Sequence, residues 1–253
     1  EAPATKYNPL VLAGPPGVGK THLMHAIGNS LLQSPEAIVA CLSAQDFLDE
    51  LVQAIDRNRV DAWRSRYRRV TAFLMDDVQL LAGKERSQEE LFHLFNLLLS
   101  SQRQLVFTMS GAPTEIKGLD DRLVSRLDGG LVTPLVPPDR ALRLAVARKQ
   151  LGTLAEEGGQ PLLEYLAARP AESVRTVLGL VHRVVGAAEA QGVAPSVSLA
   201  RELLEGAVLR PRRSTAGVRT SGILVSPTGG VRSREKFIWS WPNPADRMVE
   251  ELH

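Results

Sequence analysis

The sequence is poor in cysteine and in long hydrophobic runs. Its 253 residues include one cysteine, Cys41, so no disulfide can form within the chain, and a single thiol suits a reducing cytosol. Cys41 lies in the apolar run AIVACL, which indicates packing rather than a reactive thiol. No apolar run approaches the ~20 residues that a membrane-spanning helix needs. We therefore expect a cytoplasmic protein that does not span a membrane.

The sequence also has little net charge. The formal value of +2 is too small to predict nucleic-acid binding by itself. The charge is unevenly distributed, however, because residues 206–234 contain no acidic residue but several arginines. We interpret residues 210–234, which are also rich in Gly, Ser and Pro, as a basic flexible linker. The arginines of this region are Arg210, Arg212, Arg213, Arg219, Arg232 and Arg234.

Short apolar runs alternate with helical patterns in residues 1–136. This alternation predicts an α/β domain with a five-stranded parallel sheet covered by helices on both faces. Two helix starts are signalled by a hydroxyl three residues before a carboxylate, Ser43 with Asp46 and Ser87 with Glu90. The expected strands are Leu10–Ala13, Ala37–Leu42, Thr71–Met75, Gln104–Met109 and Leu131–Leu135.

The strand signals then stop. Four helical patterns follow and predict a small all-helical domain over residues 137–209. Residues 235–253 form a separate C-terminal tail, in which Phe237, Trp239 and Trp241 alternate as they would on a strand. Because large apolar side chains are costly to leave in water, we expect them to dock on the α/β domain or on a neighbouring subunit.

A glycine-rich turn follows the first predicted strand, in the stretch LVLAGPPGVGKTHLMHAIGNSLL. The turn fits the phosphate-loop pattern GxxxxGK[ST] between a strand and a helix. Glycines let backbone N–H groups converge on a polyphosphate, and the helix N-terminus adds partial positive charge. We expect ATP or ADP with Mg²⁺, with Lys20 reaching the β- and γ-phosphates and the Thr21 hydroxyl ligating the metal. The predicted nucleotide-binding residues are Gly14, Pro15, Pro16, Gly17, Val18, Gly19, Lys20 and Thr21.

A second strand supplies the acidic half of such a site. The stretch TAFLMDDVQ is an apolar run that ends in Asp76 and Asp77. We expect Asp76 to hold Mg²⁺ through water and Asp77 to orient the attacking water. The alternative is an acidic turn at the end of a strand without a role in catalysis.

Three longer stretches resemble one protein family. They are YNPLVLAGPPGVGKTHLMHAIGNSLL, RVDAWRSRYRRVTAFLMDDVQLLAGKERSQEELFHLFNLLL and EIKGLDDRLVSRLDGGLVTPLVPPD. They are similar to the AAA+ ATPase core of the DnaA family of bacterial replication initiators, over about residues 7–192. The run AGKERSQEELFH is the most specific, since generic AAA+ proteins lack it. The resemblance implies a P-loop AAA+ ATPase domain with a helical lid, which assembles with ATP into a filament and grips single-stranded DNA.

The resemblance also implies roles for three arginines. Arg126, in DDRLVSR, matches the arginine finger, which touches the γ-phosphate bound by the neighbouring subunit. Arg122, one turn earlier, matches a companion arginine at the same subunit interface. Arg175, in ESVRTVLGLVHR, matches the second nucleotide sensor of the helical lid. The alternative for each is a solvated helix face.

DNA contacts are implied in the same way. Residues 43–70 resemble the initiator-specific helical pair that lines the DNA channel. Val52 matches an apolar DNA contact, and Lys84 and Arg86 match basic ones. Because contacts to phosphates do not read bases, we expect binding of weak sequence preference and strong salt dependence.

The sequence departs from the family pattern at three places. Ser110, in VFTMSGAP, stands where the family has the aspartate of the first nucleotide sensor. We therefore expect slow hydrolysis and weak discrimination between ATP and ADP. The residues before Tyr7 do not match the family segment that embraces adenine. The residues after Leu209 do not match the helix-turn-helix domain that binds duplex origin boxes.

Three functions stay open on these residues. The first is a slow, DnaA-like ATPase that self-assembles and contacts single-stranded DNA in replication initiation or its control. The second is a regulatory adaptor, a DnaA-like paralogue that acts by protein contacts on the initiator or on replisome proteins. The third is a helicase loader, whose ATPase module is related. A longer native chain with a duplex-binding domain favours the first, and a native chain without one favours the second.

Overall fold

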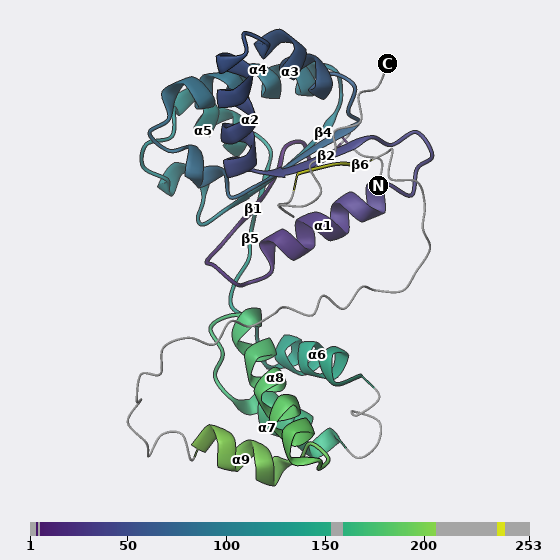
Figure 1. The fold of residues 1–253 in the computed structure, drawn as a ribbon. Coiled ribbons are helices and arrows are strands. Elements are labelled where there is room, and N and C mark those ends of the chain that lie inside the picture. The colour runs from purple at the N-terminus through teal and green to yellow at the C-terminus, as the bar shows by residue number, and fades with distance from the viewer. Residues whose placement is uncertain (1–3, 5, 153–158, 206–236, 241–253) are drawn as a thin grey trace. The chain divides into compact units, whose positions relative to one another are not determined.

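The computed structural model describes residues 4, 6–152, 159–205 and the strand at 237–240 (Figure 1). The chain divides into two compact units, residues 1–136 with 234–253, and residues 137–233. Each unit has a hydrophobic core of its own. None of the helices in the described ranges is both long and apolar enough to cross a membrane.

The first unit is built on a parallel sheet with the strand order β5-β1-β4-β3-β2-β6. The five predicted strands are confirmed, with ends that differ by at most two residues. The sixth strand comes from the C-terminal tail and lies beside β2. The strands are β1 (Leu10–Ala13), β2 (Val39–Ser43), β3 (Ala72–Asp76), β4 (Gln104–Met109), β5 (Leu131–Pro134) and β6 (Phe237–Ser240).

Helices cover both faces of this sheet (Figure 1). Helix α1 (Lys20–Leu31) packs on one face, where Met24 joins Leu74 in a hydrophobic cluster. The other face carries the larger core, which includes Phe73 and Met75. Because neighbouring β3 residues point to opposite faces, a continuous apolar run is what a strand buried on both sides needs. The elements of the larger layer are α2 (Ala44–Asp56), α3 (Val60–Tyr67), η1 (Val78–Leu81), α4 (Glu85–Ser100), η2 (Pro113–Glu115) and α5 (Asp121–Asp128).

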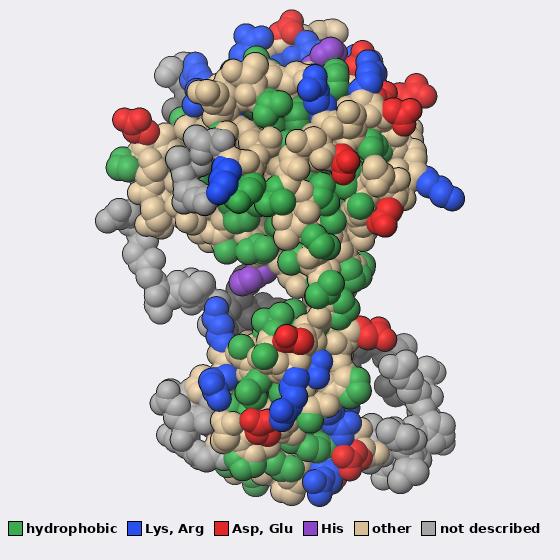
Figure 2. Space-filling view, turned by 180° about the vertical axis from the view of Figure 1, so that it is seen from behind, with side chains coloured by type: hydrophobic (Ala, Val, Ile, Leu, Met, Phe, Trp, Pro, Cys, Tyr) green, Lys and Arg blue, Asp and Glu red, His purple; other side chains and the backbone are tan. Residues whose placement is uncertain are grey.

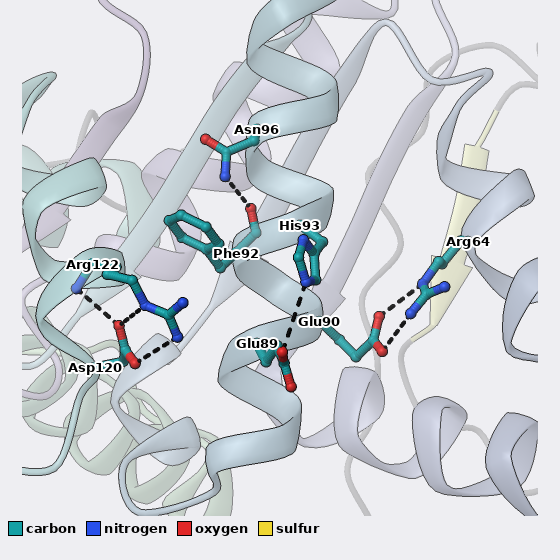
Figure 3. Close-up of polar contacts among 8 residues, drawn as sticks. All are labelled: Arg64, Glu89, Glu90, Phe92, His93, Asn96, Asp120 and Arg122. Atoms are coloured by element: carbon teal, nitrogen blue, oxygen red, sulfur yellow. Dashed lines mark hydrogen bonds and ion pairs between the residues drawn. The ribbon is translucent and has the colours of Figure 1, made fainter.

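One of the two predicted helix caps is confirmed and the other is wrong. Ser43 caps α2, and its side chain and that of Asp46 exchange the two hydrogen bonds of a capping box. Ser87, by contrast, lies inside α4, which begins two residues earlier. The physical reason is that Glu90 is engaged elsewhere, since both its carboxylate oxygens accept from Arg64 of α3, at 2.6 and 2.8 Å (Figure 3).

The second unit contains the four predicted helices. They enclose an apolar core in which the α8 residues Val177, Val181, Val184 and Ala188 are buried at helical spacing. The helices are α6 (Arg140–Leu151), α7 (Gln160–Ala168), α8 (Val174–Gln191) and α9 (Val197–Glu205). The predicted linker at 210–234 and the tail residue Trp241 lie outside the described residues.

Candidate nucleotide-binding site

The phosphate loop connects β1 to α1 at the carboxyl edge of the sheet. Gly14 is wedged between two strands, since its N–H donates to Met109 O at 3.1 Å and a Cβ here would lie 2.3 Å from Leu135 O. Gly17 and Gly19 have φ angles of 82° and 104°, which favour glycine. Glycine is therefore required at position 14 by the close strand and is favoured at positions 17 and 19 by the backbone conformation.

Lys20 is the first residue of α1 and is largely buried, with 7% of its surface exposed. Its ammonium group donates hydrogen bonds to Gly14 O at 2.7 Å and to Pro15 O at 3.0 Å. Burial lowers the pKa of Lys20, and the nearby carboxylates of Asp77 and Asp76 partly oppose this change. The Lys20 ammonium group therefore lies against the carbonyl groups of the loop, and the carboxylates of Asp76 and Asp77 act on its charge.

Asp76 connects the loop to the centre of the sheet. Its Oδ2 accepts a hydrogen bond from the Thr21 hydroxyl at 2.8 Å. Its Oδ1 accepts a hydrogen bond from the hydroxyl of Thr108, which lies on the neighbouring strand β4. The carboxylate is buried and both its oxygens are oriented by hydroxyl groups. The structure thus brings together the two residues that the sequence assigns to Mg²⁺.

Asp77 and Ser110 are linked through a residue that sequence reasoning missed. Gln79, in η1, donates to Asp77 Oδ1 at 2.9 Å, and its side-chain oxygen accepts the N–H of Ser110 at 3.1 Å. The Asp77 N–H in turn donates to the Thr108 hydroxyl at 2.9 Å. Thr108 and Gln79 therefore position the acidic turn and the Ser110 loop.

A local signal exists for one of these two residues. Thr108 is the one hydroxyl in the otherwise apolar run LVFTM, and a polar side chain in a buried strand needs a partner. Gln79 offers no such signal, because its two partners come from different parts of the chain.

The residues present suit Mg²⁺ bound together with a nucleotide. No group of three or more His, Cys, Asp or Glu residues in the described ranges could hold a metal ion unaided. Mg²⁺ prefers hard oxygen ligands and keeps waters or substrate phosphates in its shell. The Thr21 hydroxyl and the Asp76 carboxylate supply oxygen ligands of this kind.

Arg122 and Arg126 lie on α5, apart from the loop, and both are exposed. The guanidinium of Arg122 forms two contacts of 3.1 Å with the Asp120 carboxylate and lies over the Phe92 ring, 5.2 Å from its centroid (Figure 3). The hydrogen bond with Arg122 lowers the pKa of Asp120. Arg126 has no side-chain hydrogen bond to another residue in the described part of the chain, and one turn of helix separates it from Arg122.

The remaining predicted residues lie elsewhere. Arg175 is exposed in the first turn of α8, in the second unit. Val52 is 55% exposed on α2, an unusual setting for a large apolar side chain. Lys84 and Arg86 are exposed at the start of α4, directly after η1, against which α2 packs.

A phosphate loop between a strand and a helix, an acidic pair at the end of β3 and a parallel sheet with helices on both faces are the features of a P-loop domain of the AAA+ fold. The model of the bacterial DnaA ATPase domain matches residues 1–134. The chain belongs to this family.

Solved structures agree with this assignment. Domain III of the Thermotoga maritima replication initiation protein DnaA is 35% identical, with a TM-score of 0.73, over 82% of this chain and 87% of that one. The AMPPCP-bound DnaA of Aquifex aeolicus is 30% identical, with a TM-score of 0.69, over 81% of this chain and 62% of that one.

A third structure contains DNA as well. It is the replication initiator DnaA bound to AMPPCP and single-stranded DNA, which is 31% identical with a TM-score of 0.66. The match covers 75% of this chain and 60% of that one. This chain therefore spans less than two thirds of the length of the two nucleotide-bound relatives.

Proposed function

We propose that this chain is a DnaA-like ATPase core that binds ATP or ADP with Mg²⁺, assembles with ATP, and contacts single-stranded DNA in replication initiation or its control. The observation that carries this proposal is the hydrogen bond between Thr21 and Asp76, with Lys20 beside it. It joins the two halves of a nucleotide site that are 55 residues apart in the sequence. Two relatives bind AMPPCP, an ATP analogue, which supports the same reading.

In this proposal each polar residue of the nucleotide site has one role. The Lys20 ammonium exchanges the carbonyl groups of Gly14 and Pro15 for phosphate oxygens, which compensate its charge better. Thr21 ligates Mg²⁺ and Asp76 holds it through water. Bound Mg²⁺ neutralises the charge on the phosphates. Asp77, kept in place by Gln79, orients the attacking water.

Assembly is proposed to involve the exposed face of α5. Arg126 has no side-chain partner within the described residues of its own subunit, so it is available to a nucleotide bound by a neighbour. Arg122 supports the same interface, and Asp120 and Phe92 hold it in a defined orientation. Arg175 is proposed as a nucleotide sensor from the helical unit. An arginine finger supplied by another subunit, here Arg126, senses ATP only after assembly.

DNA binding is proposed to use Val52, Lys84 and Arg86. On the one face that Figure 2 draws, Lys and Arg side chains of the first unit are mixed with Asp and Glu side chains. Such a mixed surface gives no large positive field. Binding therefore rests on a few phosphate contacts per subunit and needs several subunits together.

The nucleotide site is tested by Lys20→Ala. Removing the ammonium group should weaken binding of a fluorescent ATP analogue with Mg²⁺ at least tenfold, because a charge-assisted contact to the phosphates is lost. Lys117→Ala, at an exposed lysine of the same unit, is the matched control and should bind normally. Equal affinity of the Lys20→Ala and wild-type proteins would show that the site is assigned wrongly.

A second candidate function rests on Ser110. A neutral hydroxyl at this position removes a carboxylate near the γ-phosphate, which suits a protein that holds a nucleotide without turning it over. An adaptor of this kind acts on the initiator through its own Arg126. It binds its protein partner with ATP or with ADP, and it does not need single-stranded DNA.

A further inference from the structure

Strands β5, β1, β4, β3 and β2 would form a sheet with two edges, β5 and β2, if β6 were not paired with β2, and these two edges are built differently. One edge, β5, contains Pro134, and its side chains are exposed or half-buried. Proline and short, polar or irregular edges protect a sheet from pairing with other strands. The other edge, β2, reads VACLS, without proline or charge, and its residues from Val39 to Leu42 are buried. An exposed edge of this kind presents unpaired main-chain groups to other strands, so we expect another segment to pair with it.

The C-terminal tail supplies this segment. Strand β6 pairs in parallel with β2, with Val39 opposite Phe237 and Leu42 opposite Ser240 (Figure 1). The main-chain groups on the outer side of β2 thus gain partners from a segment that follows the whole helical unit in the sequence. Main-chain pairing along an open sheet edge is also how many proteins bind extended peptides.

We propose that the outer edge of β2 is a strand-docking site, and that the segment Phe237–Ser240 of the same chain is its ligand. Backbone hydrogen bonds supply the attraction, so the site also accepts an extended peptide of the same sequence added from outside. Because the segment is covalently attached, its pairing with β2 of the same chain is intramolecular, and its effective concentration does not fall on dilution. We therefore expect the attached segment to outcompete that of another copy in dilute solution.

Docking of four residues is reversible. Each parallel pair adds a small stabilisation, and short peripheral elements open with lower free energies than a core strand does. The outward amides of β2 therefore exchange with solvent through release of β6 alone. Exchange at β1 and β4, which lie in the middle of the sheet, does not depend on that release.

The test uses the full-length chain and hydrogen exchange at β2. The double variant Ile238→Pro with Trp239→Pro removes main-chain donors and cannot form the strand. Its outward β2 amides should exchange at least tenfold faster than in the wild type, while β1 and β4 stay protected. Gly230→Pro, outside the strand, is the control and should exchange as the wild type does.

A peptide completes the experiment. Synthetic peptide of residues 235–241, added to the double variant, should restore protection of β2, and a scrambled peptide should not. The proposal is overturned if the double variant exchanges at the wild-type rate or if the peptide restores nothing. It is also overturned if wild-type protection is lost on dilution together with a dimer, because the occupant is then a second copy.

Cys41 gives a second readout. It is the one cysteine of the chain, it lies on β2, and it is paired in register with Trp239. Burial raises the pKa of its thiol to about 12. Labelling by a thiol reagent at pH 8 should accelerate at least tenfold in the double variant and slow again with the peptide. Neither readout involves nucleotide or DNA, so this proposal and the proposed function can fail separately.

Discussion

Asp76 lies at the centre of the candidate site, because its two oxygens accept hydrogen bonds from the hydroxyl groups of Thr21 on α1 and Thr108 on β4. Asp76→Asn presents an amide N–H to one of these hydroxyls and removes the charge that attracts Mg²⁺. We expect this variant to bind a fluorescent ATP analogue at least tenfold more weakly with Mg²⁺, and equally well in EDTA. Asp77→Asn is the matched neighbour: it should bind normally and lose about a hundredfold or more in turnover. Equal Mg²⁺ dependence in all three proteins contradicts the assignment.

We expect Ser110 to set how fast the proposed site hydrolyses ATP. It is exposed, and its N–H is held by Gln79, so the backbone is in place while the family's carboxylate is missing. We expect steady-state hydrolysis below about 1 s⁻¹, the lower edge of common enzyme rates. Ser110→Asp should raise turnover and the preference for ATP over ADP, and Ser110→Ala should change neither. Fast turnover by the wild-type protein is the result that refutes this expectation.

A site residue could be predicted from the sequence only where its role follows from neighbouring residues in the sequence. Lys20 and Thr21 belong to one contiguous pattern whose spacing follows from phosphate chemistry. Thr108 and Gln79 take their roles from neighbours on other strands and turns, since β3 lies between β2 and β4 only in the folded sheet. No spacing rule along the chain contains this information.

At the scale of elements, Glu50 joins the two helices of the proposed DNA-binding pair. One carboxylate oxygen on α2 accepts from Trp63 Nε1, from Arg66 and from the Tyr67 hydroxyl of α3, at 3.2, 2.7 and 2.7 Å. Trp63 and Tyr67 are buried, and burial followed by the charge of Glu50 raises the pKa of Tyr67 well above its usual value. The pair is therefore tied by a polar contact inside an aromatic cluster.

Glu50→Ala should reveal this contact. It leaves two buried donors unsatisfied, each of which costs about 1–3 kcal/mol of the free energy of unfolding. Glu50→Gln, whose amide oxygen still accepts, should lose less. Asp49→Ala, one residue earlier and exposed, is the control. Urea unfolding of the four proteins gives the comparison, and an unchanged midpoint for Glu50→Ala rules the contact out as a stabilising one.

The elements also show where prediction from sequence ends. Apolar runs in parallel strands are continuous, so all five strands could be found. The predicted helix start at Ser87 is wrong because Glu90 pairs with Arg64, which lies 26 positions away. No local sequence pattern shows this pairing. The alternation of Phe237 and Trp239 indicated a strand, yet its neighbour β2 and its register depend on which sheet edge lies open.

At the scale of the whole molecule, we expect the proposed assembly and the proposed DNA binding to be separable. Arg126 lies on α5, whereas Arg86 lies at the start of α4. Arg86→Ala should leave assembly intact and reduce the slope of log affinity against log salt by about one, because one phosphate contact is lost. Sedimentation with ATP checks assembly, and anisotropy over a salt series checks the slope. A variant that fails to assemble would place Arg86 at the interface instead.

The most direct measurement of the central claim is single-strand binding by anisotropy, with Mg²⁺ and either ATP or ADP, for the wild type and Arg126→Ala. Arg126→Ala removes a cation from the proposed subunit boundary and none from the proposed DNA surface. The account predicts that the wild type binds DNA at least tenfold more tightly with ATP than with ADP. It predicts that Arg126→Ala loses this difference while binding nucleotide normally. Equal wild-type affinity with ATP and ADP, or no binding at moderate salt, would contradict the account and favour an adaptor that works through protein contacts.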